Sequence, residues 1–221
     1  MARPARRDTK DRLVAAATEL FAERGFHGTT VRDIAERAGA NVAAGNYHYG
    51  SKKALYLEVL RAQFAQVRAL LTARGANPQT TELPRLDRPA LIRILRARIK
   101  VMLDMLIGPP PGVHGMLMQR EMVDPSEALP VIVAEFMRPM FEEMYGIVAY
   151  LAPQLDRRSV ELCVHSIIGQ GLFHRFTRPV FLEMFGFDEY PKGLAAELSD
   201  HITEFSLGGL ERLGSRRRRA R

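Results

Sequence analysis

Residues 29–52 read TTVRDIAERAGANVAAGNYHYGSK, and this stretch decides the fold. Its first half predicts a short helix, because Thr30 is a favourable N-cap and Asp33 stands three residues later, as in a capping box. Apolar residues then recur at helical spacing and predict a buried face, namely Val31, Ile34, Ala35 and Ala38. Gly39 supplies the backbone freedom for a sharp turn after this helix.

The second half of the stretch predicts another short helix at about residues 41–49. Its outward positions carry asparagine, small residues, tyrosine and histidine, which suit a surface that meets another molecule. Gly50 and Ser51 end it, and Ser51 is a favourable N-cap for a third helix. Two short helices joined by a tight turn are the layout of a helix-turn-helix, whose second helix enters the major groove of DNA.

Three short motifs in this region carry a family resemblance. They are Ala38-Gly39, Asn46-Tyr47-His48-Tyr49, and Ser51-Lys52 followed by Leu55-Tyr56. Together they resemble the TetR family of bacterial transcriptional regulators, and the fuller run over residues 38–52 is similar to its CecR-like subgroup. This resemblance covers residues 8–60. Further along the chain, Arg120-Glu121-Met122 with Asp124-Pro125 resembles the CecR-type C-terminal domain.

The resemblance implies which residues contact DNA. It places base contacts at Val42, Ala43, Ala44 and Asn46, and phosphate contacts at Thr30, Arg32, Tyr47, His48 and Lys52. Of the base contacts, the Asn46 amide is suited to pair with adenine. Gly45 departs from the family, which usually has a bulky aliphatic residue there, and a glycine inside a helix costs roughly 1 kcal/mol relative to alanine. Tyr49 is expected to pack in the small core of this region.

Composition favours an all-α fold. The chain has 221 residues, 47% of them hydrophobic, and few alternating strand patterns. We expect a three-helix DNA-binding domain over residues 1–53, a helical regulatory and dimerisation domain over residues 54–214, and a basic tail over residues 215–221. A single cysteine, Cys163, excludes an intramolecular disulfide framework and is typical of a reducing compartment. Without a signal peptide or an apolar run of membrane-spanning length, we expect a cytoplasmic protein with no membrane partner.

The charge of the chain is unevenly distributed. The net charge is +7 and the sequence pI about 9.9, which favours an anionic partner. Basic residues gather at both ends, namely Arg3, Arg6, Arg7, Lys10 and Arg12 at the start, and Arg216 to Arg219 with Arg221 at the end. The first group precedes the helix-turn-helix and is expected to reach phosphates or the minor groove. The second is interpreted as a solvated, disordered tail.

Helical periodicity and turn signals define the remaining elements. Helices are predicted at about residues 8–24, 51–74, 90–107, 113–123, 126–151, 157–177 and 193–213. Pro139 is expected to bend the helix over residues 126–151. The polar segment over residues 75–89 is the best domain boundary, and residues 181–190 are interpreted as a short apolar loop.

All methionines after Met1 lie between Met102 and Met184. This clustering has two interpretations: a core filled by an adaptable side chain, or a pocket that repacks around apolar ligands. The family resemblance favours the pocket. Its candidate lining is Met102, Met105, Met118, Met122, Phe136, Met140 and Met144, with Arg120, His165 and Gln170 as polar anchors.

Gly169 and Gly171 lie in the middle of a predicted helix, where glycine is unfavourable. The close approach of another helix is the simplest reason, either between two subunits or within one. The family resemblance implies a homodimer built on a four-helix bundle, to which Gly169, Gly171, Leu198, Ile202 and Phe205 would contribute.

The sequence lacks the motifs of a catalytic or metal site. His165 and His174 are nine residues apart and fall on opposite faces of a helix, and no zinc, phosphate-loop or nucleophile motif is present. We therefore expect no metal, no cofactor and no enzyme activity. The predicted function is sequence-specific transcriptional control at a palindromic operator, as a repressor released by a small hydrophobic or aromatic ligand. The alternatives are a regulator gated by a protein partner, and a helical enzyme or adaptor with a vestigial DNA-binding fold.

Overall fold

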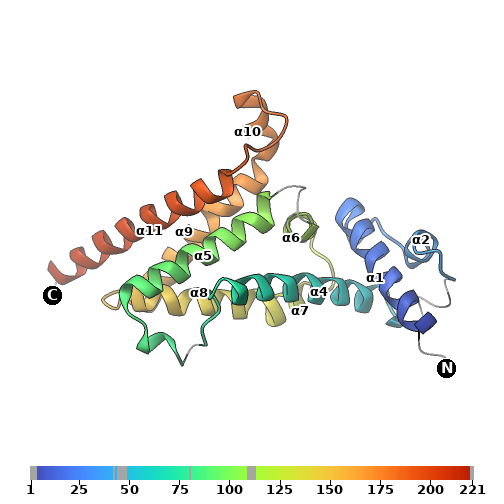
Figure 1. Cartoon of the computed structure of the whole chain (residues 1–221), viewed down its shortest axis with the longest axis horizontal. Coiled ribbons are helices and arrows are strands. Elements are labelled where there is room, and N and C mark those ends of the chain that lie inside the picture. The colour runs from blue at the N-terminus through green and yellow to red at the C-terminus, as the bar shows by residue number, and fades with distance from the viewer. Residues whose placement is uncertain (1–3, 42, 44–48, 80, 109–112, 220–221) are drawn as a thin grey trace. The chain divides into compact units, whose positions relative to one another are not determined.

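The computed structural model of the chain describes residues 4–41, 43, 49–79, 81–108 and 113–219 (Figure 1). Every regular element within these ranges is a helix, which confirms the all-α prediction. The chain forms two compact units. Unit 1 comprises Met1–Gln66 and Val113–Glu135, and unit 2 comprises Val67–Gly112 and Phe136–Arg221.

Unit 1 combines N-terminal helices with a segment from the middle of the chain. Its helices are α1 (Pro4–Arg24), α2 (Val31–Arg37), the first part of α4 (Lys52–Ala73), α6 (Val113–Val123) and α7 (Leu129–Ile132). The predicted inner stripe of α1 is buried, namely Leu13, Ala17, Leu20 and Phe21. Phe21 packs edge-on against Tyr56 of α4 with ring centroids 4.8 Å apart, so α1 and α4 share one core.

Unit 2 is a bundle of longer helices. It contains the 3₁₀ turn η1 (Leu83–Arg85), α5 (Arg88–Ile107), α8 (Arg138–Leu151), α9 (Arg157–Phe176), α10 (Arg178–Phe185) and α11 (Leu194–Arg219). Aspartate side chains cap two of them: Asp87 accepts from the Ala90 amide at 2.7 Å, and Asp156 from the Ser159 amide at 2.8 Å. Helices α5, α8, α9 and α11 enclose the main apolar core, and α4 ends in this unit.

The structure corrects one predicted loop. Residues 178–185 form helix α10, although residues 181–190 were expected to be irregular. Pro179 occupies the first turn of α10, where proline is favourable, and Gly186 ends the helix in the left-handed region at φ 67°. Thr177 is the C-cap of α9 and also the N-cap of α10, so Pro179 follows one helix and lies in the first turn of the next.

Two other helix predictions need adjustment. The helix expected over residues 126–151 begins at Leu129 and contains a π-helical turn, η2 (Val133–Met137), directly before α8. Pro139 has no amide hydrogen, so the regular bond to the carbonyl four residues earlier is lost and a wider turn takes its place. At the C-terminus, α11 continues to Arg219, so the basic run over residues 216–219 is helical and not a disordered tail.

Candidate nucleic-acid interface

The N-terminus of α2 is fixed by the predicted capping box. The Thr30 hydroxyl accepts a hydrogen bond from the Asp33 amide at 3.1 Å, and the Asp33 carboxylate accepts from the Thr30 amide at 2.9 Å. The same carboxylate accepts from the Thr30 hydroxyl at 2.7 Å, and these bonds lower the pKa of Asp33. This reciprocal pairing fixes the backbone at the start of α2, where Arg32 is exposed.

Helix α2 is held against α1 by apolar and ionic contacts. Ile34 and Ala35 are fully buried, and Arg37 pairs with Glu19 of α1 at 3.0 Å. After Ala38, Gly39 turns the chain in the left-handed conformation at φ 59°, as the sequence predicts. The Asn41 side chain then accepts from the Ala43 amide at 3.0 Å, directly after the turn.

Most of the expected base-reading positions lie outside the described residues. These are Val42, Ala44 and Asn46; the expected phosphate contacts Tyr47 and His48 also lie outside them, as does Gly45. Ala43 is described, helical and exposed. Thr30, Arg32, Ala43 and Lys52 are therefore the candidate DNA-contacting residues whose surroundings the structure defines.

Lys52, at the first position of α4, also has an internal role. Its ammonium donates a hydrogen bond to the Phe26 carbonyl at 2.9 Å and lies 4.1 Å from the centroid of the Phe26 ring. An ammonium group has three donors, so this bond leaves others for a phosphate. Lys52 thus joins the loop after α1 to the start of α4.

Tyr49 packs against α1, in keeping with its expected role in the small core. Its hydroxyl donates to the Lys10 carbonyl at 3.4 Å, and the Lys10 ammonium lies 5.8 Å from its ring centroid. Lys10 also pairs with Glu58 of α4 at 3.6 Å. Burial, reinforced by the Glu58 and Asp11 carboxylates, raises the pKa of Tyr49 to about 12, so the phenol stays protonated at neutral pH.

The motif at residues 120–125 contacts helix α1. Arg120 of α6 donates to the Ala22 carbonyl at 2.8 Å and also to the Glu23 carbonyl, at the C-terminal end of α1. Its side chain covers Gly25, where an added Cβ would lie 3.4 Å from the Arg120 Cδ. Arg120 therefore satisfies carbonyl groups that the end of α1 leaves without helical partners.

Glu121 of the same motif binds α4 inside unit 1. Its carboxylate accepts from the Tyr56 hydroxyl at 3.0 Å and from both the Ser126 amide and the Ser126 hydroxyl at 3.0 Å. Both Glu121 and Tyr56 are buried, and burial together with the neighbouring carboxylate raises the pKa of Tyr56 well above its usual value. Three donors compensate the desolvation of the Glu121 charge.

The ten ligand-pocket candidates divide between the two units. Met118, Arg120 and Met122 belong to unit 1, where Met118 is buried, Met122 is 41% exposed and Arg120 binds the end of α1. The other seven belong to unit 2, namely Met102, Met105, Phe136, Met140, Met144, His165 and Gln170.

Within unit 2, the structure brings some of these candidates together. Met105 and Met140 pack against one buried cluster, which consists of Val67 and Leu71 of α4 with Ala76 and Val101. Met144 lies in the larger core, and Met102 packs against it from the edge. His165 is exposed on α9, and its ring centroid lies 5.2 Å from that of Phe141. Gln170 donates a hydrogen bond to the Ser166 carbonyl at 3.3 Å. Both side chains therefore make local contacts at the surface of the bundle.

The dimer candidates also separate into two groups. Gly171 faces α5 of the same chain, because a Cβ there would meet the Met102 Cε at 2.5 Å. This is the intramolecular explanation that the sequence left open, and Ile202 is likewise buried in the core of its own subunit. Leu198 packs partly against that core. In the part of the chain that the structure describes, no atom lies within 4 Å of a Cβ added at Gly169, and Phe205 is 67% exposed.

Sequence reasoning missed the clearest feature of α9 and α11, which is a row of exposed apolar or small residues along each helix. On α9 the row contains Leu162, Gly169, Phe173 and Phe176, and on α11 it contains Phe205, Gly208, Gly209 and Leu213. The spacings of three, four and seven residues keep each row on one helix face. The same periodicity is visible in the sequence, but it could not show which face the core covers.

Metal-binding clusters and membrane-spanning helices are absent from the described residues. Over the described ranges, no group of three or more histidine, cysteine, aspartate or glutamate side chains is arranged to hold a metal ion. In the same ranges, the helices lack the combined length and apolar character needed to cross a bilayer.

Comparison with known proteins gives the family. Residues 13–59 match the model for bacterial regulatory proteins of the TetR family, and residues 91–210 match that for the C-terminal domain of the HTH-type transcriptional dual regulator CecR. CecR of Shigella flexneri is 28% identical over 201 residues, covering 88% of this chain and 87% of CecR. RutR of Escherichia coli K12 is 44% identical over 52 residues, or 24% of each chain.

Solved structures show the same fold. The hemolysin II transcriptional regulator HlyIIR aligns with a TM-score of 0.61 at 24% identity, over 90% of this chain and 98% of that one. The fatty acid degradation regulator FadR of Bacillus halodurans aligns with a TM-score of 0.64 at 16% identity, over 91% and 96%. The chain belongs to the TetR family of DNA-binding bacterial transcriptional regulators, whose members act as dimers, and it carries a CecR-type C-terminal domain.

Proposed function

We propose that this protein is a dimeric repressor that binds a palindromic operator and is released from it by a small hydrophobic or aromatic ligand. The observation that carries the proposal is the capped N-terminus of α2 with the exposed Arg32, followed at the start of α4 by Lys52. In this reading residues 1–53 bind DNA, residues 54–214 mediate regulation and dimerisation, and residues 215–221 form a basic extension.

The DNA contacts fall into two kinds. Thr30, Arg32, Tyr47, His48 and Lys52 hold phosphates and set the position of the protein on the duplex. Val42, Ala43, Ala44 and Asn46 face base edges, where Asn46 pairs with adenine and the apolar residues contact thymine methyl groups. Arg32 supports the first assignment, since it is exposed in the first turn of α2.

Dimerisation through α9 and α11 supplies the second half-site. The exposed rows on these helices include Phe173 at 59% and Phe205 at 67% exposure, which is unfavourable for a subunit alone in water. Glycines on the same faces allow close approach of a partner helix. A two-fold dimer then presents two recognition helices to half-sites about 34–36 Å apart.

Control by a ligand operates through α4 in this proposal. This helix begins at Lys52 beside the recognition segment, and its residues Val67 and Leu71 pack with Met105 and Met140 in unit 2. Methionine side chains adapt to different shapes, so an apolar ligand entering this region repacks the end of α4. The ligand shifts the equilibrium only by its difference in affinity between the DNA-competent and DNA-incompetent states.

The function is tested by gel-shift titration on a palindromic fragment from the neighbouring promoter and by in vitro transcription from it. Arg32→Ala is expected to weaken binding to all sequences similarly, whereas Asn46→Ala relaxes discrimination at one base pair by about 1–3 kcal/mol. Arg93→Ala, which removes an exposed arginine from α5, is the matched control. Equal binding of cognate and scrambled fragments by the wild type would refute the proposal. Repression that responds only to a protein partner would favour the partner-gated alternative.

A further inference from the structure

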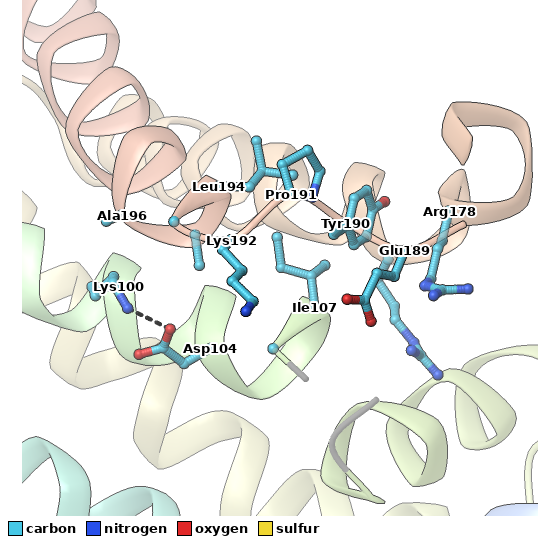
Figure 2. A pocket seen from close by; sticks show the side chains of 14 residues that line it. Lys100, Asp104, Ile107, Arg178, Glu189, Tyr190, Pro191, Lys192, Leu194 and Ala196 are labelled. Carbon is cyan, nitrogen blue, oxygen red and sulfur yellow. Dashed lines mark hydrogen bonds and ion pairs between the residues drawn. The ribbon is translucent and has the colours of Figure 1, made fainter. Parts of the chain in front are cut away.

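Unit 2 contains a cavity of about 290 Å³ that lies apart from all ten ligand-pocket candidates. One wall is the C-terminal half of α5, and the opposite wall is the segment over residues 189–196, which leads into α11 (Figure 2). Arg175 of α9 and Arg178 of α10 complete the lining. Its volume is at the lower end of the range for small-molecule sites.

Arg175 is the unusual residue of this cavity. The buried face of α9 is apolar for about three turns, through Val160, Val164, Ile167 and Gly171, and then carries Arg175 on the same face. Arg175 is only 8% exposed, and among the described residues its buried Nε has no hydrogen-bond partner and its guanidinium no ion pair. A buried cation without an acceptor is costly, and its position in the last turn of α9 offsets that cost only in part.

The other charges of the lining leave an excess of cations. Lys100, Arg175, Arg178 and Lys192 face the cavity together with two carboxylates, Asp104 and Glu189. Asp104 is neutralised by Lys100 and by Arg74, which lies 3.1 Å from it. Figure 2 shows the Lys100–Asp104 pair on the α5 wall and Lys192 extending from the opposite wall. An anion that enters therefore meets Arg175 and Lys192 without displacing an ion pair.

The wall that carries Lys192 is anchored by a half-buried tyrosine. Tyr190 donates its hydroxyl to the His174 carbonyl on α9, and its ring packs against Phe181 of α10 at 5.1 Å. The Arg178 guanidinium lies 5.7 Å from the same ring centroid. Apolar side chains fill the remaining lining, namely Ile107, Pro191, Leu194, Ala195 and Ala196. The cavity thus combines cationic side chains with an apolar surface.

We propose that this cavity binds a small organic carboxylate, with its anionic group on Arg175 and Lys192 and its apolar body against Ile107, Tyr190 and Leu194. A carboxylate suits Arg175 because the planar guanidinium can donate two parallel hydrogen bonds to it. The site is additional to the methionine region around the end of α4, and its occupancy does not depend on DNA binding.

The test uses the full-length protein and three sodium carboxylates, benzoate, phenylacetate and hexanoate, each paired with its uncharged primary amide at constant ionic strength. Thermal unfolding and isothermal titration calorimetry measure binding. At least one carboxylate is expected to raise the Tm of the wild type by clearly more than its amide. Carboxylates that act no differently from their amides would overturn the proposal, and inorganic phosphate that protects equally well would overturn the role of the apolar body.

Variants locate the site. Arg175→Met keeps an apolar stem in the buried position and is expected to abolish the carboxylate-specific shift, with a loss of affinity of about tenfold or more. Lys192→Gln, at an exposed position that tolerates substitution, is expected to weaken binding by a smaller factor, and Glu189→Gln to strengthen it. Arg93→Met is the matched control on the surface of α5. Unchanged carboxylate binding in both Arg175→Met and Lys192→Gln would place the anion elsewhere, whether or not the protein binds its operator.

Discussion

The hydroxyl of Tyr56 on α4 donates a 3.0 Å hydrogen bond to the Oε2 atom of Glu121 on α6. The two residues are 65 positions apart, and both are buried, with Tyr56 1% and Glu121 2% exposed. Glu121 belongs to the CecR-type domain by sequence, yet it lies in the same compact unit as the DNA-binding helices. Segment 113–135 is thus a structural part of the unit that carries α1, α2 and the start of α4.

This hydrogen bond makes Tyr56→Phe a sensitive probe of unit 1. The substitution leaves one oxygen of the buried Glu121 carboxylate without its donor, and we expect a loss of about 1–3 kcal/mol in the free energy of unfolding. Urea denaturation measures it. Tyr150→Phe removes the hydroxyl of a tyrosine that is 45% exposed on α8 and serves as the control. Equal stability of the two variants would contradict a structural role for the pair.

Arg120 is expected to act on α1 and not on a ligand. Arg120→Met removes the hydrogen bonds to the Ala22 and Glu23 carbonyls, and the free energy of unfolding should fall by about 1 kcal/mol, a modest value because Arg120 is largely exposed. Operator affinity should fall in parallel, since α1 supports α2. If Arg120 instead anchors a ligand, this variant would keep its stability and lose only the response to that ligand.

The sequence was sufficient to predict those structural features that depend only on residues close to one another in the chain. The capping box of Thr30 and Asp33, the turn at Gly39 and the bounds of α6 are all as predicted, because caps and glycine turns act within a few positions. Helix α10 was missed because Pro179 is compatible with both the end of one helix and the start of the next.

Contacts between residues far apart in the chain could not be predicted from local sequence patterns. Nothing local to Arg120 shows that it reaches carbonyls 97 and 98 residues earlier, and the family pattern alone suggested a ligand anchor. Gly169 and Gly171 are two residues apart and therefore lie on nearly opposite faces of α9, but only the packing of Met102 against Gly171 shows which of these faces is the core. Arg175 was not singled out, because its burial depends on how α9 packs against the rest of unit 2.

Substitutions of Lys52 and Arg32 are expected to have different effects. Lys52 contributes to both protein stability and DNA affinity, whereas Arg32 contributes to DNA affinity alone. Lys52→Ala loses the hydrogen bond to the Phe26 carbonyl and the contact with the Phe26 ring, so both thermal stability and operator affinity should fall. Arg32→Ala should lower affinity, reduce the salt dependence of binding by about one unit of slope, and leave Tm unchanged. A Lys52→Ala variant that keeps wild-type Tm but loses DNA would assign Lys52 to phosphate alone.

The exposed row on α9 predicts the behaviour of Phe173. Phe173→Glu places a charge where the proposed dimer buries an aromatic ring, and the variant is expected to sediment as a monomer and to lose tight operator binding. Val123→Glu, on α6 at a position that is 71% exposed, is the control and should stay dimeric. A Phe173→Glu variant that remains a dimer would exclude this face of α9 from the interface.

Gly171→Leu should instead lower subunit stability by about 1–3 kcal/mol, because the new side chain collides with Met102.

His114 predicts a pH dependence of stability. It is 8% exposed on α6, packs edge-on against Phe64 at 4.9 Å, and has its Nδ1 buried without a hydrogen-bond partner. Desolvation lowers the pKa of His114 to about 4, from a usual value of 6.5. Below pH 6.5 the unfolded chain therefore binds a proton that the folded chain does not, so this residue lowers the free energy of unfolding as the pH falls from 6.5 toward 4.

The size of this loss of stability follows from the difference between the pKa of His114 in the folded chain, about 4, and its usual value of 6.5. Between pH 7.5 and pH 4.5, wild-type protein should lose about 2 kcal/mol more stability than His114→Gln, which cannot gain a proton in this range. Urea titrations of both proteins at several pH values measure the difference, and carboxylates and the other histidines cancel because both proteins contain them. His174, whose pKa is also lowered by burial, remains in both and contributes with the same sign. Parallel pH profiles for the two proteins would show that the His114 imidazole is protonated in the folded state, and that α6 therefore does not bury it as a neutral ring.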